Sequence, residues 1–139
     1  MILRLILAFG LLGVCVAIHA TALTIAFRRI GPVPEAATGA GWSLILRLIR
    51  IASWLIAAHL AEIAVWALFY TGLHVFPDAE SSFYFSAVTY TTVGYGDLVP
   101  PYSWRLLAGV EGLTGILMCG WSAGFFFAVV SRMHTVERR

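Results

Sequence analysis

The chain has 139 residues, of which 60% are hydrophobic and only 12% are charged, whereas soluble domains average about 25% charged residues. A soluble fold of this size could not bury so much apolar surface, so the composition excludes one and predicts a single membrane domain over residues 1–139. There is no lysine and no basic patch with interleaved aromatic residues, so nucleic acid is not an expected partner. An enzyme is not expected either, since the sequence offers no nucleophile–base pair, phosphate loop or metal cluster.

Three stretches are apolar over a length that can cross a bilayer, which takes about 20 residues of helix. They are Ile2–Phe27, Ser43–Val75 and Trp104–Val130. The segment Arg28–Gly41 between the first two contains glycine and proline breakers and predicts a short loop. The sequence therefore predicts an all-α membrane protein with three transmembrane helices, the first of them within residues 1–30.

The uneven distribution of arginine predicts the orientation of these spans. Arginine-rich segments next to spans stay on the cytoplasmic side, so the loop after the first span and the carboxyl-terminal tail are expected there. The amino terminus and the Phe76–Ser103 loop are then external, in a cell membrane. The arginines that carry this prediction are Arg28, Arg29, Arg47, Arg50, Arg132, Arg138 and Arg139.

A cleaved signal peptide is an alternative interpretation of the first span, because Ala20-Thr21-Ala22 resembles a small-residue cleavage site. Cleavage there would reverse the second span and leave the Phe76–Ser103 loop in the cytoplasm with the arginines outside. The arginine distribution favours the uncleaved helix.

The loop between the second and third spans begins with a helix signal. Asp78–Ser82 combines capping side chains with acids in a first turn. We expect Phe83–Thr91 to form a helix of about three turns that enters the membrane without crossing it. Lipid cannot bond stray backbone groups, so this helix must be buried in protein. The negative end of its dipole would then stabilise a cation.

The seven residues at the end of this helix form the most specific pattern in the chain, Thr91-Thr92-Val93-Gly94-Tyr95-Gly96-Asp97. Within it, TVGYG is the sequence from which potassium channels build a selectivity filter, using backbone carbonyls from four loops. The chain therefore resembles the potassium channel pore-domain family, specifically the small bacterial tetrameric channels. The resemblance covers an outer helix, pore loop and inner helix over residues 42–132, and the amino-terminal helix is additional.

The resemblance implies a potassium site made of backbone, with K⁺ ions and no organic cofactor. Glycine reaches cheaply the backbone angles that aim successive carbonyls at one axis. The implied ligands are four consecutive carbonyls and the hydroxyl of the first residue: Thr92, Val93, Gly94 and Tyr95. The implied supports of the filter are Thr91, Gly96 and Asp97.

Two positions before the filter depart from the pattern of some bacterial relatives. Phe85 and Val88 fall where those relatives carry Trp and Glu, which hydrogen-bond the filter aspartate. Neither side chain can form such a bond. We expect Tyr84, Tyr90 or external water to replace them, and the inactivation behaviour of those relatives does not carry over.

The third span resembles the inner helix of the family. Gly115 falls at the expected hinge midway along it, although recurring glycines also give small faces for helix packing. Ile116, Cys119, Ala123 and Phe127 share the face expected to line the cavity. Phe127 could close that cavity as an apolar gate, or it could be bulk that faces lipid.

Several ionisable residues fall inside the spans, where a charge is costly unless it is paired or hydrated. His59 and Glu62 share one face of the second span, and Glu111 lies in the outer half of the third. We expect these three to form a buried polar network, with His19 of the first span nearby. Such a network is either structural or sensitive to protons, because histidine titrates near physiological pH.

One pore loop cannot close a filter built from four, so the resemblance implies a homotetramer in the lipid bilayer with the pore on its axis. The expected function is passive, potassium-selective conduction. A non-conducting or regulatory subunit of another cation channel is an alternative. A potassium transporter is another, although transporters usually carry four degenerate repeats in one chain.

Overall fold

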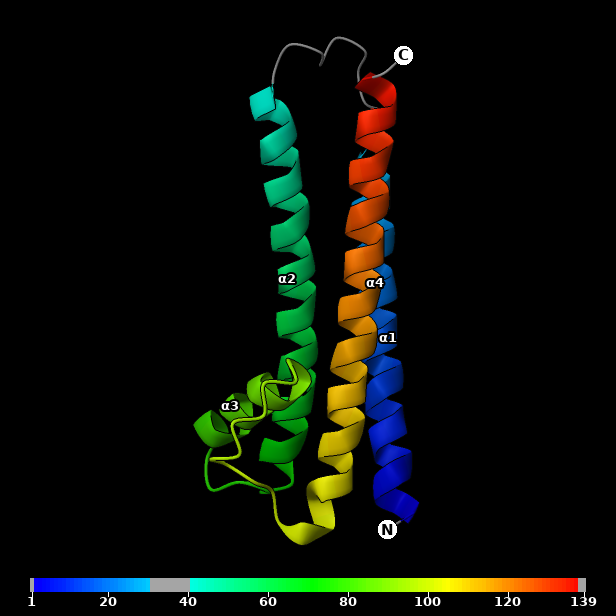
Figure 1. The fold of residues 1–139 in the computed structure, drawn as a ribbon. Helices are drawn as coiled ribbons and strands as arrows, with labels where there is room; N and C mark the ends of the chain where they lie inside the picture. Colours follow the sequence, from blue (N-terminus) through cyan, green and yellow to red (C-terminus); the bar gives the residue numbers. More distant parts are fainter. Residues whose placement is uncertain (1, 31–40, 138–139) are drawn as a thin grey trace.

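The computed structural model describes residues 2–30 and 41–137 and is helical throughout, apart from connecting loops (Figure 1). No strand occurs in these described ranges, so the prediction of an all-α protein is confirmed. The predicted loop after the first span falls largely on residues 31–40, and Arg138 and Arg139 form the tail; both lie outside the described residues. The elements in chain order are α1 (Ile2–Ile30), α2 (Gly41–Gly72), α3 (Ala79–Tyr90), the 3₁₀ turn η2 (Tyr102–Trp104) and α4 (Arg105–Glu137).

Three helices can cross a membrane, over Ile2–Arg29, Ile45–Gly72 and Tyr102–Ser131, as the sequence predicts. At 1.5 Å per residue, a 28-residue span is about 42 Å long and exceeds the hydrocarbon core of about 30 Å. The chain is therefore a multi-pass membrane protein whose helices tilt or extend into the headgroup region.

The second span ends three residues earlier than predicted, at Gly72 rather than Val75. His74 adopts a left-handed backbone with φ of +50°. Its amide donates to the Thr71 carbonyl at 3.1 Å, and the Val75 amide donates to the Tyr70 carbonyl at 3.0 Å. This pair of bonds is a Schellman motif, which closes a helix and is usually built on glycine. The chain turns there toward α3.

The three long helices lie side by side, and short α3 lies beside the ends of α2 and α4 (Figure 1). The amino terminus of α1 lies at the same end as α3, which we call the filter end. The opposite end carries Arg28, Arg29, Arg47 and Arg50, and we call it the arginine end. Because each long helix crosses once, this arrangement places the loop after α3 and the four arginines at opposite ends.

Aromatic side chains attach α3 to α2 at the filter end. The Phe85 ring lies 5.5 Å from Tyr70 and 4.8 Å from Phe76, measured between ring centroids. All three side chains are buried. Phe85 therefore anchors α3 through apolar and edge-to-face contacts.

The additional helix α1 packs against both α2 and α4. At the filter end, Arg4 donates to the Ser103 carbonyl at 2.7 Å, and its guanidinium lies 4.5 Å from the Trp104 ring centroid. Toward the arginine end, the Trp54 indole donates to the Ala22 carbonyl at 2.9 Å. The helix is thus held to its neighbours near both of its ends.

Gly115 lies where α4 crosses the end of α3. A Cβ atom placed on it would lie 1.7 Å from the Tyr90 carbonyl oxygen, a separation that no side chain can occupy. Helix α4 runs unbroken through this position. The structure thus gives Gly115 the packing role weighed above, and its role as a hinge stays a prediction.

We expect Gly115→Ala to destabilise the protein, because the added methyl group would force α3 and α4 apart. Overpacking of this kind costs about 1–3 kcal/mol or more. The measurement is the melting temperature of the purified protein in detergent. Gly109→Ala is the matched control, since a Cβ there meets nothing within 4 Å. Equal melting temperatures for the two variants would contradict the close approach.

Candidate functional site

Helix α3 begins inside the predicted start signal, at Ala79 rather than at Phe83, with Asp78 as its cap. The Asp78 carboxylate accepts the Ser81 backbone amide at 2.7 Å, which satisfies an amide that the first turn leaves free. This bond lowers the pKa of Asp78. At the other end of α3, the Thr91 hydroxyl donates to the Ala87 carbonyl at 2.6 Å. Side chains therefore bond the backbone at both ends of the helix, and the sequence predicted this only at the Asp78 end.

The segment Thr91–Asp97, which we call the filter loop, returns its first amides to α3. The Thr92 amide donates to the Thr89 carbonyl at 3.0 Å, and the Val93 and Gly94 amides donate to the Val88 carbonyl at 3.0 and 3.2 Å. The described chain has no cis peptide bond, and the N–H and C=O of a planar trans peptide point in opposite directions. The carbonyls of Thr91, Thr92 and Val93 therefore point away from α3, on one side of the loop.

Along the filter loop, residues with a left-handed backbone (positive φ) alternate with residues that do not have one. Thr92, Gly94 and Gly96 have φ values of +62°, +54° and +77°, while Val93 and Tyr95 between them do not have positive φ. Glycine adopts this left-handed region at little cost, but a β-branched residue such as threonine is strained there. The two glycines were identified from the sequence. Thr92 was not identified as a left-handed position, because nothing in its side chain signals one.

Tyr84 supports Asp97 at the outer end of the loop. Its hydroxyl donates to the Asp97 carboxylate at 2.6 Å, and the same carboxylate accepts the Leu98 amide at 3.0 Å. The bond from Tyr84 lowers the pKa of Asp97 and raises that of Tyr84. Of the replacements expected for the missing Trp and Glu, Tyr84 takes this position, whereas Tyr90 is directed elsewhere.

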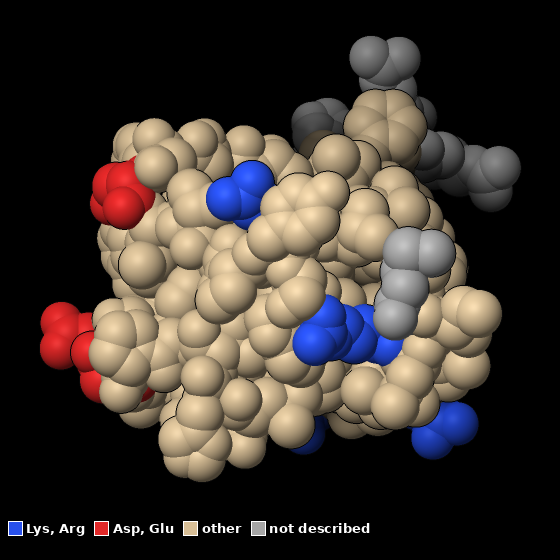
Figure 2. Space-filling model, turned by 90° about the horizontal axis from the view of Figure 1, so that it is seen from below, with Lys and Arg blue, Asp and Glu red and all other residues tan. Residues whose placement is uncertain are grey.

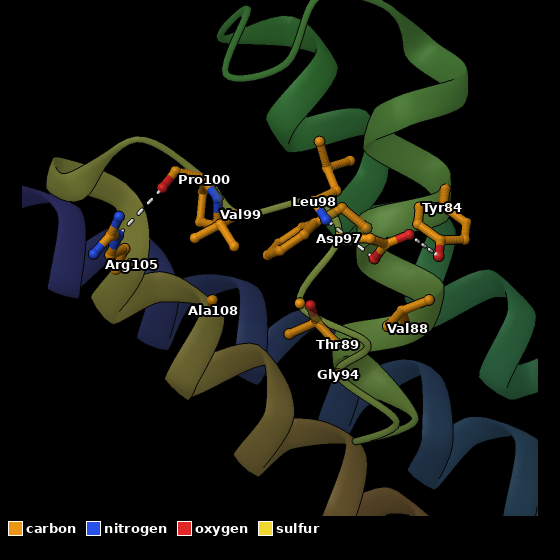
Figure 3. Close-up of a pocket in the computed structure, with 12 residues that line it drawn as sticks. Tyr84, Val88, Thr89, Gly94, Asp97, Leu98, Val99, Pro100, Arg105 and Ala108 are labelled. Carbon is orange, nitrogen blue, oxygen red and sulfur yellow. Dashed lines mark hydrogen bonds between the residues drawn. The ribbon is translucent and has the colours of Figure 1, made fainter.

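A cavity of about 310 Å³ lies between α3, the filter loop and the start of α4 (Figure 3). Val88 of α3 and Gly94 of the filter loop line one side of it, and Pro100 and Ala108 line the side of α4. The short side chain of Val88 leaves this space open behind the loop. Support for the loop there comes from the Tyr84–Asp97 bond at the rim of the cavity rather than from a filled interior.

The filter end carries acidic side chains along one edge, and arginine side chains lie nearer the middle of this otherwise uncharged face (Figure 2). Asp78, Glu80 and Asp97 are exposed at the start of α3 and at the end of the filter loop. Like charges beside a low-dielectric surface raise the local concentration of cations.

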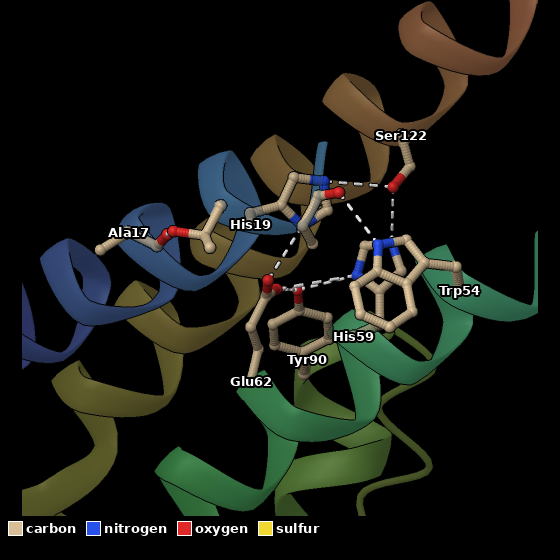
Figure 4. Close-up of polar contacts among 9 residues, drawn as sticks. Ala17, His19, Trp54, His59, Glu62, Tyr90 and Ser122 are labelled. Atoms are coloured by element: carbon tan, nitrogen blue, oxygen red, sulfur yellow. Dashed lines mark hydrogen bonds and ion pairs between the residues drawn. The ribbon is translucent and has the colours of Figure 1, made fainter. Parts of the chain in front are cut away.

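A closed ring of hydrogen bonds lies within the bundle, on the side of the filter loop that faces the arginine end (Figure 4). Glu62 accepts from Tyr90 and is 2.9 Å from His19 Nδ1. The Tyr90 hydroxyl is also 3.0 Å from His59 Nδ1. The Ser122 hydroxyl closes the ring, at 3.0 Å from His59 Nε2 and 3.2 Å from His19 Nε2. We call these five side chains, which come from α1, α2, α3 and α4, the polar ring.

The polar ring can be satisfied without net charge. It contains five hydrogen bonds, and one proton in each bond leaves the carboxyl, the phenol, the hydroxyl and both imidazoles neutral in total. The net charge of the ring is also zero if Glu62 is a carboxylate and one of the two histidines is an imidazolium. Neutrality matters because His19, Glu62 and Tyr90 are buried in a membrane-spanning bundle, where net charge is expensive.

Glu111 is not part of this ring, which corrects the prediction of one network with His59 and Glu62. Its carboxylate accepts from the Tyr70 hydroxyl at 3.0 Å, and both residues are fully buried. Ser86 lies beside it, but the Ser86 hydroxyl and Glu111 Oε1 make no hydrogen bond of acceptable geometry among the described residues. Glu62 and Glu111 thus belong to two separate clusters. The sequence missed Ser122, since a single serine in an apolar helix does not indicate which face is buried.

The predicted gate position lies on a free face of α4. Phe127 is 72% exposed and Ile116 is 61% exposed in the single chain. Cys119 and Ala123 on the same face are also exposed. This face is available to line a cavity or to meet another subunit, and the gate stays a prediction.

Comparison with known protein families gives one match. Residues 45–132, well over half of the chain, match a family described as ion channel. The matched segment includes nearly all of α2, all of α3, the filter loop and most of α4. No curated protein and no solved structure matches the chain.

We expect Tyr84→Phe to raise the pKa of Asp97 toward the ordinary value, because the hydrogen bond that favours the carboxylate is lost. Stabilisation from this bond is present above the ordinary aspartate pKa of about 3.9 and is lost as pH falls through the lowered value. Titration of the Asp97 side-chain carbon by NMR measures the change. Tyr102→Phe, at an exposed tyrosine without a bond to Asp97, should leave the titration unaltered; equal shifts in both variants would refute the assignment.

We expect Ser122→Ala to lower stability by about 1–3 kcal/mol, because one nitrogen of each histidine in the polar ring loses its partner. Thermal unfolding in detergent measures the loss. Thr24→Ala is the control, since the exposed Thr24 hydroxyl bonds the Ala20 carbonyl of its own helix. A Ser122→Ala protein as stable as this control would show that the ring is not closed through Ser122.

Proposed function

The chain belongs to the ion channel family, and we propose that it is a potassium-selective channel that conducts K⁺ passively. Membership of the family implies oligomeric assembly in a membrane and permeation by ions. The observation that carries potassium selectivity is the attachment of the Thr92, Val93 and Gly94 amides to α3. It leaves the consecutive carbonyls of Thr91, Thr92 and Val93 on one side, the last two of them within TVGYG, and a filter of stacked carbonyl rings requires carbonyls in this orientation.

In this proposal the filter loop replaces the water around a K⁺ ion. The carbonyls of Thr92, Val93, Gly94 and Tyr95, with the Thr92 hydroxyl, form successive binding positions. Repulsion between ions in neighbouring positions moves them along, so no energy source is needed. The carboxyl end of α3 adds the negative end of a helix dipole.

We propose a homotetramer, for which the exposure of the filter loop is the support. Every residue of Thr91–Asp97 is exposed in the single chain. Irregular backbone at membrane depth is stable only against protein or a water-filled cavity. Four copies around a cyclic axis would enclose the loops and bury part of the free face of α4.

We further propose that the filter end faces outward in a cell membrane. The support is the location of Arg28, Arg29, Arg47 and Arg50 at the opposite end, because arginine-rich ends stay cytoplasmic. The amino terminus would then be outside and the carboxyl terminus inside.

Flux through the purified protein in liposomes tests the proposal. We expect potassium flux that barium blocks, with sodium flux near background. Gly94→Ala should abolish selective flux, because φ of +54° strains any side chain. Gly109→Ala, at an ordinary helical glycine, should conduct normally. Oligomeric state is measured on the same samples by native mass spectrometry.

Two results would contradict the proposal. Equal potassium and sodium flux would refute selectivity. A clean tetramer without flux would instead favour the alternative, a non-conducting or regulatory subunit of another cation channel.

A further inference from the structure

A second and larger cavity, of about 570 Å³, opens at the arginine end between α1, α2 and α4. Arg29 of α1 and Arg47 and Arg50 of α2 line it. Its other lining residues are apolar or small, among them Ile51 and Trp54. We call this cavity the arginine pocket. It lies at the opposite end from the filter loop and shares no residue with it.

Three positive side chains line the arginine pocket without a described acid among them. No carboxylate belongs to its described lining, and the described ion pairs join only histidines to Glu62. Arg47 and Arg50 are three residues apart and share one face of α2, while Arg29 approaches from α1 with its guanidinium 5.6 Å from the Trp54 ring centroid. Guanidinium groups that line one cavity can bind phosphate there through paired hydrogen bonds.

The position of the arginine pocket and its apolar lining favour a phospholipid over a free phosphate ion as the ligand. The pocket lies at the end of three membrane-spanning helices, where headgroups meet hydrocarbon. Ile51 and Trp54 continue from the arginines along α2, and Ala57 lies one turn further toward the membrane centre. A free phosphate ion would use only the arginines, whereas a phospholipid would place its phosphate on them and an acyl chain along the apolar residues.

The pocket also lies where α1 is attached to the rest of the bundle. The Trp54 indole both lines the pocket and donates to the Ala22 carbonyl of α1 at 2.9 Å (Figure 4). A ligand with its phosphate on Arg29 and on Arg47 would join α1 to α2 on the far side of that bond. The ligand would therefore stabilise the docking of the additional helix.

We propose that the arginine pocket binds an anionic glycerophospholipid, with the phosphate held by Arg29, Arg47 and Arg50 and an acyl chain against Ile51 and Trp54. The site differs from the filter loop in place, chemistry and ligand. Its occupancy does not depend on whether the protein conducts potassium.

Lipid titration of the purified full chain in detergent tests the proposal. The probes are dioleoyl phosphatidylglycerol, phosphatidylcholine with the same chains, and inorganic phosphate. We expect saturable stabilisation by phosphatidylglycerol alone, read as a rise in melting temperature and as retained lipid in native mass spectra. Each arginine removed should weaken binding about fivefold, so the double variant Arg47→Gln/Arg50→Gln should bind about 25-fold more weakly.

Arg28→Gln is the matched control, because Arg28 lies in the same last turn of α1 as Arg29 but does not line the pocket. It should bind phosphatidylglycerol like the unaltered protein. If the double variant does not fold, Arg50→Gln alone should still show the fivefold loss. Equal losses for Arg28→Gln and Arg50→Gln would reduce the effect to general attraction and overturn the site. Equal effects of inorganic phosphate, or of phosphatidylcholine, would overturn an anionic lipid as the ligand.

Discussion

A backbone group inside a bilayer has no water to bond, and the carboxyl end of α3 is where this chain meets that constraint. Its last carbonyls would be free, but they accept the Thr92, Val93 and Gly94 amides of the filter loop. These three hydrogen bonds thus close α3 and also set the direction of the carbonyls of the filter loop. The Tyr90 carbonyl at the same end lies against Gly115, so the position of α4 depends on the same point.

The polar ring connects this point to the additional helix. The Tyr90 hydroxyl bonds Glu62, whose other oxygen meets His19 of α1. A protein of three crossing helices has little apolar core with which to orient them, since lipid is as apolar as the side chains that would fill it. Directed hydrogen bonds do this instead, and a ring that is neutral in total can do so without burying net charge. Arg4 and Trp54 add bonds toward the two ends of α1.

The residue that hydrogen-bonds Asp97 differs from the one expected from the pattern of some bacterial relatives. Phe85 stands where a hydrogen-bonding side chain is expected, and it packs against Tyr70 and Phe76 instead. Tyr84, one residue earlier and about 100° away around the helix, donates to Asp97. The sequence could show that Phe85 and Val88 cannot bond Asp97. Of the candidates it left open, only the packing of α3 decided that Tyr84 does so and that Tyr90 joins the polar ring.

The sequence by itself determined the membrane class, the three spans, the helix start within Asp78–Ser82 and the glycines at left-handed positions of the filter loop. These follow from local chemistry: apolar length, a capping side chain next to a free amide, and glycines where the backbone is left-handed. The separation of Glu111 from His59 and Glu62, the inclusion of Ser122, and the contact of Gly115 with Tyr90 were decided only by the tertiary structure. Each depends on how a helix is rotated and where it crosses its neighbour, and that is set by contacts between residues far apart in the chain.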